Sequence, residues 1–135
     1  MKPIKSNDIV AEVLLKHNAV LADRFDAHVL ILKAPMLLGV DDAVREAVEL
    51  INVDRDKAKS RLVFLLETTG GYIEVVERIY AVVRTHYTHV DFIIPNYAYS
   101  AGTVLVMSGD NIYMDYYSVL GPIDPQFQND AGELV

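Results

Sequence analysis

The sequence contains no cysteine. Disulfide bonds, thiolate metal sites and a thiol nucleophile are therefore excluded within these residues. No other pattern of metal-ligating or cofactor-binding residues stands out, so we expect neither a metal nor another cofactor. The lack of disulfides fits a cytoplasmic protein, because disulfide bonds are typical of oxidising compartments.

Basic charge and long apolar runs are also scarce. The 12 Lys and Arg residues are outnumbered by 19 Asp and Glu, and the net charge is −7. Nucleic acids and anionic lipids favour clustered Lys and Arg, so we expect neither as a partner. No stretch reaches the roughly 20 apolar residues of a membrane span, and the first residues lack the apolar region of a signal peptide. We expect a cytoplasmic location, and membrane association stays open because a span could lie outside this sequence.

The sequence does contain enough apolar material for a buried core, because 52% of its 135 residues are hydrophobic. The length corresponds to one domain, and we expect a single domain over residues 1–135. The last residues are polar until they turn apolar at Leu134 and Val135. We interpret this ending as a truncation of the domain at its C-terminus.

Short apolar runs alternate with segments of helical periodicity along the chain. The runs predict strands at 28–33, 61–67, 90–94 and 111–114. The periodic segments predict helices at 7–22, 41–51, 73–84 and 100–108. This alternation predicts an α/β fold in which right-handed crossovers build a parallel sheet. In such sheets, ligands bind at the carboxyl ends of the strands.

One segment after a predicted strand is a candidate catalytic site, namely Tyr97-Ala98-Tyr99-Ser100-Ala101-Gly102-Thr103. A serine between small residues, after a strand and before a helix, is a way to hold a reactive hydroxyl at a helix N-terminus. Ser100 is therefore a candidate nucleophile. The alternative is that Ser100 only caps the helix, since serine is a preferred N-cap residue.

A second segment, Gly70-Gly71, follows the strand at 61–67 and lies on the same predicted rim. Glycine permits unusual backbone angles, so this turn could present an N–H group to a substrate. Acyl transfer needs a nucleophile, a base and two donors for the oxyanion. The N–H of Ala101 is the natural second donor. The alternatives for Gly70-Gly71 are a tight connection or a phosphate loop, and no phosphate-loop motif is present.

Several ordered motifs between Arg61 and Gln126 carry a resemblance to a known family. They are Thr-Thr-Gly-Gly-Tyr, Ile-Ile-Pro-Asn-Tyr-Ala-Tyr-Ser-Ala-Gly-Thr, Asp-Asn-Ile-Tyr-Met-Asp and Leu-Gly-Pro-Ile-Asp-Pro-Gln. The sequence resembles the serine dehydrogenase proteinase family of the ClpP/crotonase superfamily, whose relatives include SppA and membrane-bound ClpP-class proteases. The resemblance implies a ClpP/crotonase-like spiral of parallel βαβ units.

The resemblance also implies roles for individual residues. Ser100 matches the nucleophile, Gly71 the glycine whose amide builds the oxyanion hole, and Ala101 the second donor. Around them we name candidate substrate-binding residues, which are Gly70, Tyr72, Tyr99 and Asp124.

The general base is missing from the expected place. ClpP-like peptidases have a histidine about two dozen residues after the serine, where this sequence has Ile123, Asp124 and Pro125, and SppA-like enzymes use a lysine. No Lys, Arg or His follows Ser100. The base could lie beyond Val135, come from a neighbouring subunit, or be absent from an inactive protein. We favour a base, by analogy a lysine, beyond Val135.

Two histidines and two aspartates are weaker candidates. His86 and His89 should lie at the opposite rim of the sheet from Ser100, and they lack a third ligand for a metal. Asp115 and Asp124 could orient a base, yet aspartate in such turns commonly bonds its own backbone. The tyrosines near the serine segment favour a subunit interface.

We therefore expect a serine peptidase that acts on peptide or protein substrates and forms a homo-oligomer. A catalytically inactive assembly or scaffold protein of the same fold is the second hypothesis. A crotonase-like acyl-CoA enzyme, which needs no serine nucleophile, is the third, and basic groups for the CoA phosphates are sparse at this rim.

Overall fold

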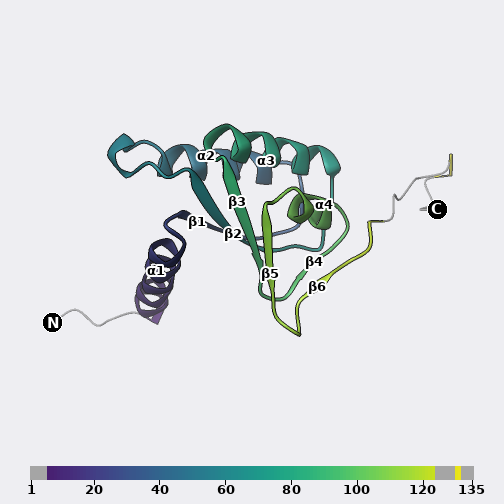
Figure 1. Ribbon diagram of the computed structural model, residues 1–135. Coiled ribbons are helices and arrows are strands. Elements are labelled where there is room, and N and C mark those ends of the chain that lie inside the picture. The colour runs from purple at the N-terminus through teal and green to yellow at the C-terminus, as the bar shows by residue number, and fades with distance from the viewer. Residues whose placement is uncertain (1–5, 124–129, 132–135) are drawn as a thin grey trace.

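The protein, described here from a computed structural model, has a four-stranded parallel sheet with helices packed on it (Figure 1). The structure describes residues 6–123 and 130–131. The sheet has the order β1-β2-β3-β5, and its strands are β1 (His28–Lys33), β2 (Arg61–Glu67), β3 (His89–Ile94) and β5 (Asn111–Met114). The helices are α1 (Ser6–Phe25), α2 (Val40–Ile51), α3 (Ile73–His86) and α4 (Ala101–Met107), with a short 3-10 helix η1 (Arg55–Lys57).

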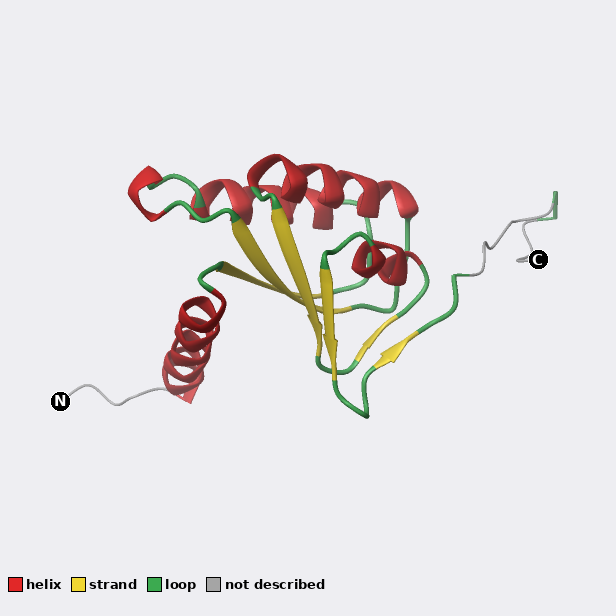
Figure 2. Ribbon diagram, in the orientation of Figure 1, coloured by secondary structure: helices red, strands yellow, loops and turns green. Residues whose placement is uncertain are grey.

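A second, smaller sheet consists of β4 (Tyr97–Ala98) and β6 (Val119–Leu120), which pair in parallel. Figure 2 shows this sheet beside α4, next to the ends of the long strands. An isolated bridge joins Thr68, just after β2, to Ala98 in β4. The small sheet is therefore linked to the carboxyl end of β2.

The core lies between the sheet and helices α2 and α3. The central strand β2 contributes Leu62, Phe64 and Leu66, each at most 1% exposed. Phe64 stacks on Phe92 of β3 with a centroid distance of 5.2 Å. Apolar side chains of α2 and α3 cover this layer, because both helices repeat apolar residues at helical spacing. Burial of these side chains is the main stabilising contribution to the fold.

Helix α1 lies away from α2 and α3 and packs near β1 and β2 (Figure 1). Its last residue, Phe25, places its ring edge-on to Tyr113, with centroids 5.5 Å apart. The guanidinium of Arg61 lies 5.4 Å from the Phe25 ring centroid. These contacts explain why the helix continues three residues beyond the predicted end at Ala22.

The predicted α/β class with a parallel sheet is confirmed, and all four predicted strands are present. The helix predicted from residue 100 begins at Ala101 instead, because Ser100 has a non-helical backbone. The strand pair β4 and β6 was not predicted as such. Two-residue strands carry too little periodicity to be recognised, and these depend on pairing with distant segments.

Candidate active site

Ser100 lies on a sharp turn between β4 and α4. Its backbone angles are φ 53° and ψ −123°, a conformation that L-residues rarely adopt. Such a conformation costs on the order of 1–3 kcal/mol and persists only where the surrounding structure imposes it. The half-buried serine stands at the N-cap position of α4, yet its side chain makes no capping hydrogen bond. The alternative interpretation of the Ser100 side chain as a helix cap is therefore wrong.

Backbone pairing on both sides of the turn imposes this conformation. The Tyr99 N–H donates to the Thr68 oxygen at 3.0 Å, and the Gly121 N–H donates to the Ala98 oxygen at 2.8 Å. On the helix side, the Thr103 N–H donates to the Ser100 oxygen at 2.9 Å. The strand before the serine and the helix after it are both fixed, so the turn has little freedom to relax.

The Gly70-Gly71 turn is held by Met36, which follows β1. The Met36 N–H donates to the Gly70 oxygen at 2.8 Å, and the Tyr72 N–H donates to the Met36 oxygen at 2.9 Å. In a trans peptide the C=O and the following N–H point in opposite directions. The described chain has no cis peptide bond. Because the Gly70 carbonyl faces Met36, the Gly71 N–H points away from Met36.

The two turns are in direct contact. A Cβ atom placed on Gly70 would come within 2.7 Å of the Tyr99 oxygen and 2.9 Å of the Ser100 Cβ. Gly70 and Gly71 also have φ values of 95° and 146°, in the region that favours glycine. Only glycine at position 70 therefore allows the turn to approach the serine this closely.

Neither the Gly71 N–H nor the Ala101 N–H has a hydrogen-bond acceptor among the residues that the structure describes. The Gly70 N–H, in contrast, donates to the Thr68 Oγ1 at 3.1 Å. Free donors beside an uncapped serine are the arrangement that can stabilise an oxyanion during acyl transfer.

The predicted substrate-binding residues are partly placed by the structure. Tyr72 follows the glycine turn and is 54% exposed, while Tyr99 precedes the serine and is 37% exposed. The Tyr99 ring stacks on Tyr97 at a centroid distance of 4.7 Å. Each of the two turns thus has a tyrosine next to it. The fourth candidate, Asp124, lies outside the described residues.

Asp115 belongs to a turn of its own. Its Oδ1 accepts the N–H groups of Tyr117 at 2.8 Å and of Ser118 at 3.0 Å. The Tyr117 N–H and the Ser118 hydroxyl together hold the pKa of Asp115 below its ordinary value. This carboxylate is therefore occupied by its own turn, as expected for aspartate in such a segment.

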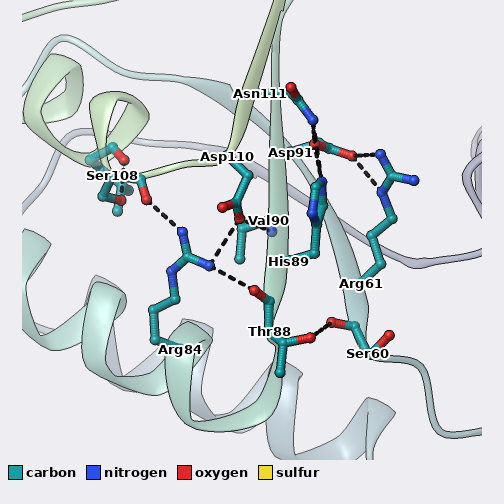
Figure 3. A network of polar contacts seen from close by, with 11 residues as sticks. Ser60, Arg61, Arg84, Thr88, His89, Val90, Asp91, Ser108, Asp110 and Asn111 are labelled. Atoms are coloured by element: carbon teal, nitrogen blue, oxygen red, sulfur yellow. Dashed lines mark hydrogen bonds and ion pairs between the residues drawn. The ribbon is translucent and has the colours of Figure 1, made fainter.

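A polar network occupies the opposite end of the sheet, where β2, β3 and β5 begin (Figure 3). Its centre is Asp91, which is fully buried. Arg61 contacts the Asp91 Oδ2 at 2.6 Å, while His89 and Asn111 contact the Oδ1 at 2.8 and 2.9 Å. Burial raises the pKa of Asp91, but the hydrogen bonds from Asn111, His89 and Arg61 outweigh it and lower the pKa overall.

The same rim contains a second cluster around Arg84. Its guanidinium donates to the Asp110 carboxylate at 3.0 Å and to the Ser108 oxygen at 2.7 Å. The Nδ1 of His86 lies 2.9 Å from the backbone oxygen of Val82, which is one turn earlier in α3. His86 and His89 thus lie at the amino ends of the strands, away from Ser100, as predicted. The role of Asp91 was not predicted, although a lone aspartate inside an apolar strand is a recognisable signal.

Residues 6–123 and 130–131 contain neither a metal-binding group nor a helix suited to span a membrane. No three or more His, Asp or Glu side chains within this part of the chain are grouped to hold a metal ion. Within the same residues, no helix combines the length and apolar character that membrane crossing requires.

Comparison with known proteins gives a family and a set of relatives. Residues 36–134 match the model of a family described as ClpP-like SDH-type serine proteinase. An uncharacterized protein of Methanocaldococcus jannaschii is 31% identical over 84 residues, which are 62% of this chain and 29% of that protein. A second from the same organism is 37% identical over 62 residues, 46% of this chain and 21% of that protein. The chain thus spans less than a third of the curated relatives it matches.

Solved structures with the same fold include two proteases. The 1510-N membrane-bound stomatin-specific protease, in a mutant bound to a substrate peptide, has a TM-score of 0.64 and 20% identity. The match covers 79% of this chain and 49% of that one. ClpP1 from Listeria monocytogenes has a TM-score of 0.60 and 12% identity, covering 76% of this chain and 62% of that one.

The backbone of Ser100 leads to a stability prediction. Ser100→Gly should be about 1 kcal/mol more stable than Ser100→Ala, because both lose the hydroxyl and only glycine removes the strain. Urea unfolding at pH 7 measures the difference. Equal midpoints for the two variants would mean that the turn stores no strain.

The Asp91 network leads to a prediction about pH. Because the folded pKa of Asp91 is lowered, its stabilisation is present above the unfolded pKa of about 3.9 and is lost as pH falls through the folded value. Asp91→Asn should lower the free energy of unfolding by about 2 kcal/mol at pH 7. The difference from wild type should shrink below about pH 4.

Urea unfolding between pH 7 and pH 3 tests this, with the exposed Asp23→Asn as the matched control. A deficit in Asp91→Asn that stays constant over the whole range would show that the charge of Asp91 contributes nothing.

Proposed function

The chain belongs to the ClpP-like SDH-type serine proteinases, and from this premise we propose that it is a serine peptidase with Ser100 as nucleophile. The observation that carries the proposal is the strained, uncapped Ser100 packed against a glycine turn, with two N–H groups in these turns that have no acceptor among the described residues. A serine that only capped a helix would need neither the strain nor the free donors. Strain of this kind is concentrated at functional sites.

In the proposed reaction, the Ser100 Oγ attacks the carbonyl carbon of a peptide bond while its proton passes to a general base. The N–H groups of Gly71 and Ala101 stabilise the negative oxygen of the tetrahedral intermediate. The C–N bond then breaks, and the base returns the proton to the leaving amine. Water hydrolyses the acyl-enzyme by the same two steps and regenerates the serine.

We place the general base outside these 135 residues, because no Lys, Arg or His follows Ser100. Two structures of the stomatin-specific protease carry mutations of a lysine and of a serine to alanine. By analogy, the proposed base is a lysine amine of a longer form of the protein, supplied by the same chain or by a neighbouring copy of that longer form.

The proposed substrate is a peptide or protein segment that lies between the two turns. In this proposal, the partly exposed Tyr72 and Tyr99 contact its side chains, while Gly70 lets the glycine turn pack directly against Ser100. The N–H and C=O of Gly70 are already used by Thr68 and Met36, so its contribution is the close packing of the two turns rather than a hydrogen bond to substrate. Asp124 remains a candidate contact.

An inactive scaffold is the second candidate, and the absent base is the observation that favours it. An acyl-CoA enzyme would not require the strained conformation of Ser100, so the geometry gives it less support.

We further propose that the protein forms a homo-oligomer. Its exposed apolar and aromatic side chains support this, since soluble monomers seldom leave large contiguous apolar surfaces uncovered. Tyr116 is 100% exposed and Tyr117 is 68% exposed, both in the turn after β5. A groove between α3 and α4 is lined largely by apolar side chains, namely Ile73, Val76, Tyr80, Val104 and Leu105.

Fluorophosphonate labelling tests the nucleophile. The probe should add to the longest natural form of the protein at Ser100, releasing fluoride, and the 135-residue chain alone should react at least tenfold more slowly because it lacks the base. Intact-mass spectrometry measures the adduct.

Ser100→Ala should abolish labelling, whereas the matched control Ser108→Ala at the other end of α4 should label normally. Persistent labelling of Ser100→Ala would identify another nucleophile. No labelling of the longest form would support the scaffold function.

Equilibrium sedimentation tests the oligomer. We expect association at micromolar concentration, weakened by the double substitution Tyr116→Ser with Tyr117→Ser and unaffected by Leu50→Ser, an exposed leucine near the end of α2. A wild-type monomer at every concentration would contradict the oligomer proposal.

A further inference from the structure

Thr68 is a buried polar residue that contacts both turns of the proposed site. It follows β2 directly and is 2% exposed. Buried hydroxyl groups are normally hydrogen-bonded, because an unpaired one loses its interaction with water. The Thr68 Oγ1 accepts the N–H of Gly70 at 3.1 Å, within the buried interior of the turn.

The backbone of Thr68 pairs with the strand that leads to the serine. Its N–H donates to the Tyr97 oxygen at 3.3 Å, and its oxygen accepts the Tyr99 N–H at 3.0 Å. Its methyl group faces the first turn of α4, where a Cβ placed on Gly102 would come within 2.2 Å of the Thr68 Cγ2. One side chain and its backbone thus contact the glycine turn, β4 and α4.

These contacts fix the direction of the Gly71 N–H from two sides. The Thr68 hydroxyl fixes the peptide plane before Gly70, and Met36 fixes the plane after it through the Gly70 carbonyl. Glycines can rotate such planes at little cost, since they have few steric limits. Without the hydroxyl, the buried Gly70 N–H would lose its acceptor and could regain one only if the turn moved.

We propose that Thr68 is a positioning residue that holds the Gly71 N–H toward the reacting carbonyl and keeps the glycine turn in register with Ser100. This inference rests on the proposed serine peptidase function. Thr68 touches no reacting atom and acts through the Gly71 amide and the Ser100 turn. Its hydroxyl should affect the rate of the chemical step rather than the binding of substrate, because the oxyanion forms only during reaction.

The test compares fluorophosphonate labelling of wild type and Thr68 variants of the longest natural form of the protein. The maximal labelling rate and the half-saturating probe concentration are measured separately. Thr68→Val keeps the branched shape and removes the hydroxyl. Its maximal labelling rate should fall about 10- to 100-fold, since losing a whole oxyanion donor costs about 100- to 1,000-fold. The half-saturating concentration should stay within about twofold. Thr68→Ser keeps the hydroxyl and should stay within about threefold of wild type in maximal rate.

Thr88→Val is the control, because it too removes a threonine hydroxyl bonded to the backbone, here one that donates to the Ser60 oxygen at the opposite rim. It should label at the wild-type rate. A Thr68→Val variant that is folded by circular dichroism and labels at the wild-type rate would overturn the inference. If Thr68→Val does not fold, a folded Thr68→Ser that labels as slowly as Ser100→Ala would overturn it. Failure of the wild type to label at Ser100 would instead overturn the proposed function itself.

Discussion

Parallel pairing between β2 and β3 is the constraint on which the proposed site depends. The two strands run side by side from Arg61 and His89 to their carboxyl ends, so the segments that follow them emerge at one rim. The pairing then continues beyond the sheet as the bridge between Thr68 and Ala98. This pairing therefore brings residues some 30 positions apart in the sequence into van der Waals contact. No local propensity of either turn would bring them together.

The sequence was informative where burial is continuous and less so where the conformation depends on pairing with distant segments. Apolar runs predicted all four long strands because both faces of a parallel sheet need apolar side chains. The Ser-Ala-Gly and Gly-Gly segments were recognised by their small residues. The backbone angles of Ser100 could not be read from sequence, since serine tolerates a cap as readily as a strained turn. Their cause is pairing with Thr68 and Gly121, which only the folded chain provides.

Thr68 itself was overlooked because a threonine after a strand has no distinctive pattern. Its importance follows from three contacts that belong to different parts of the chain. Asp91 was overlooked although its pattern is distinctive, since an aspartate within an apolar strand needs buried partners. In the folded protein it gathers Arg61, His89 and Asn111 around one buried carboxylate. The two ends of the sheet thus differ: charges are neutralised at the amino end, while donors are left unpaired at the carboxyl end.

The close approach of Gly70 to Ser100 has a consequence for how such a protein is made. The unusual geometry of the serine depends on long-range backbone pairing with Thr68, which follows β2, and with the segment at Gly121. A nascent or partly folded chain would present an ordinary serine without oriented donors beside it. A peptidase built in this way would be harmless during its own synthesis, because the ability to cut would arrive with the last long-range contacts. Folding would act as the activation step that many proteases assign to cleavage of a propeptide.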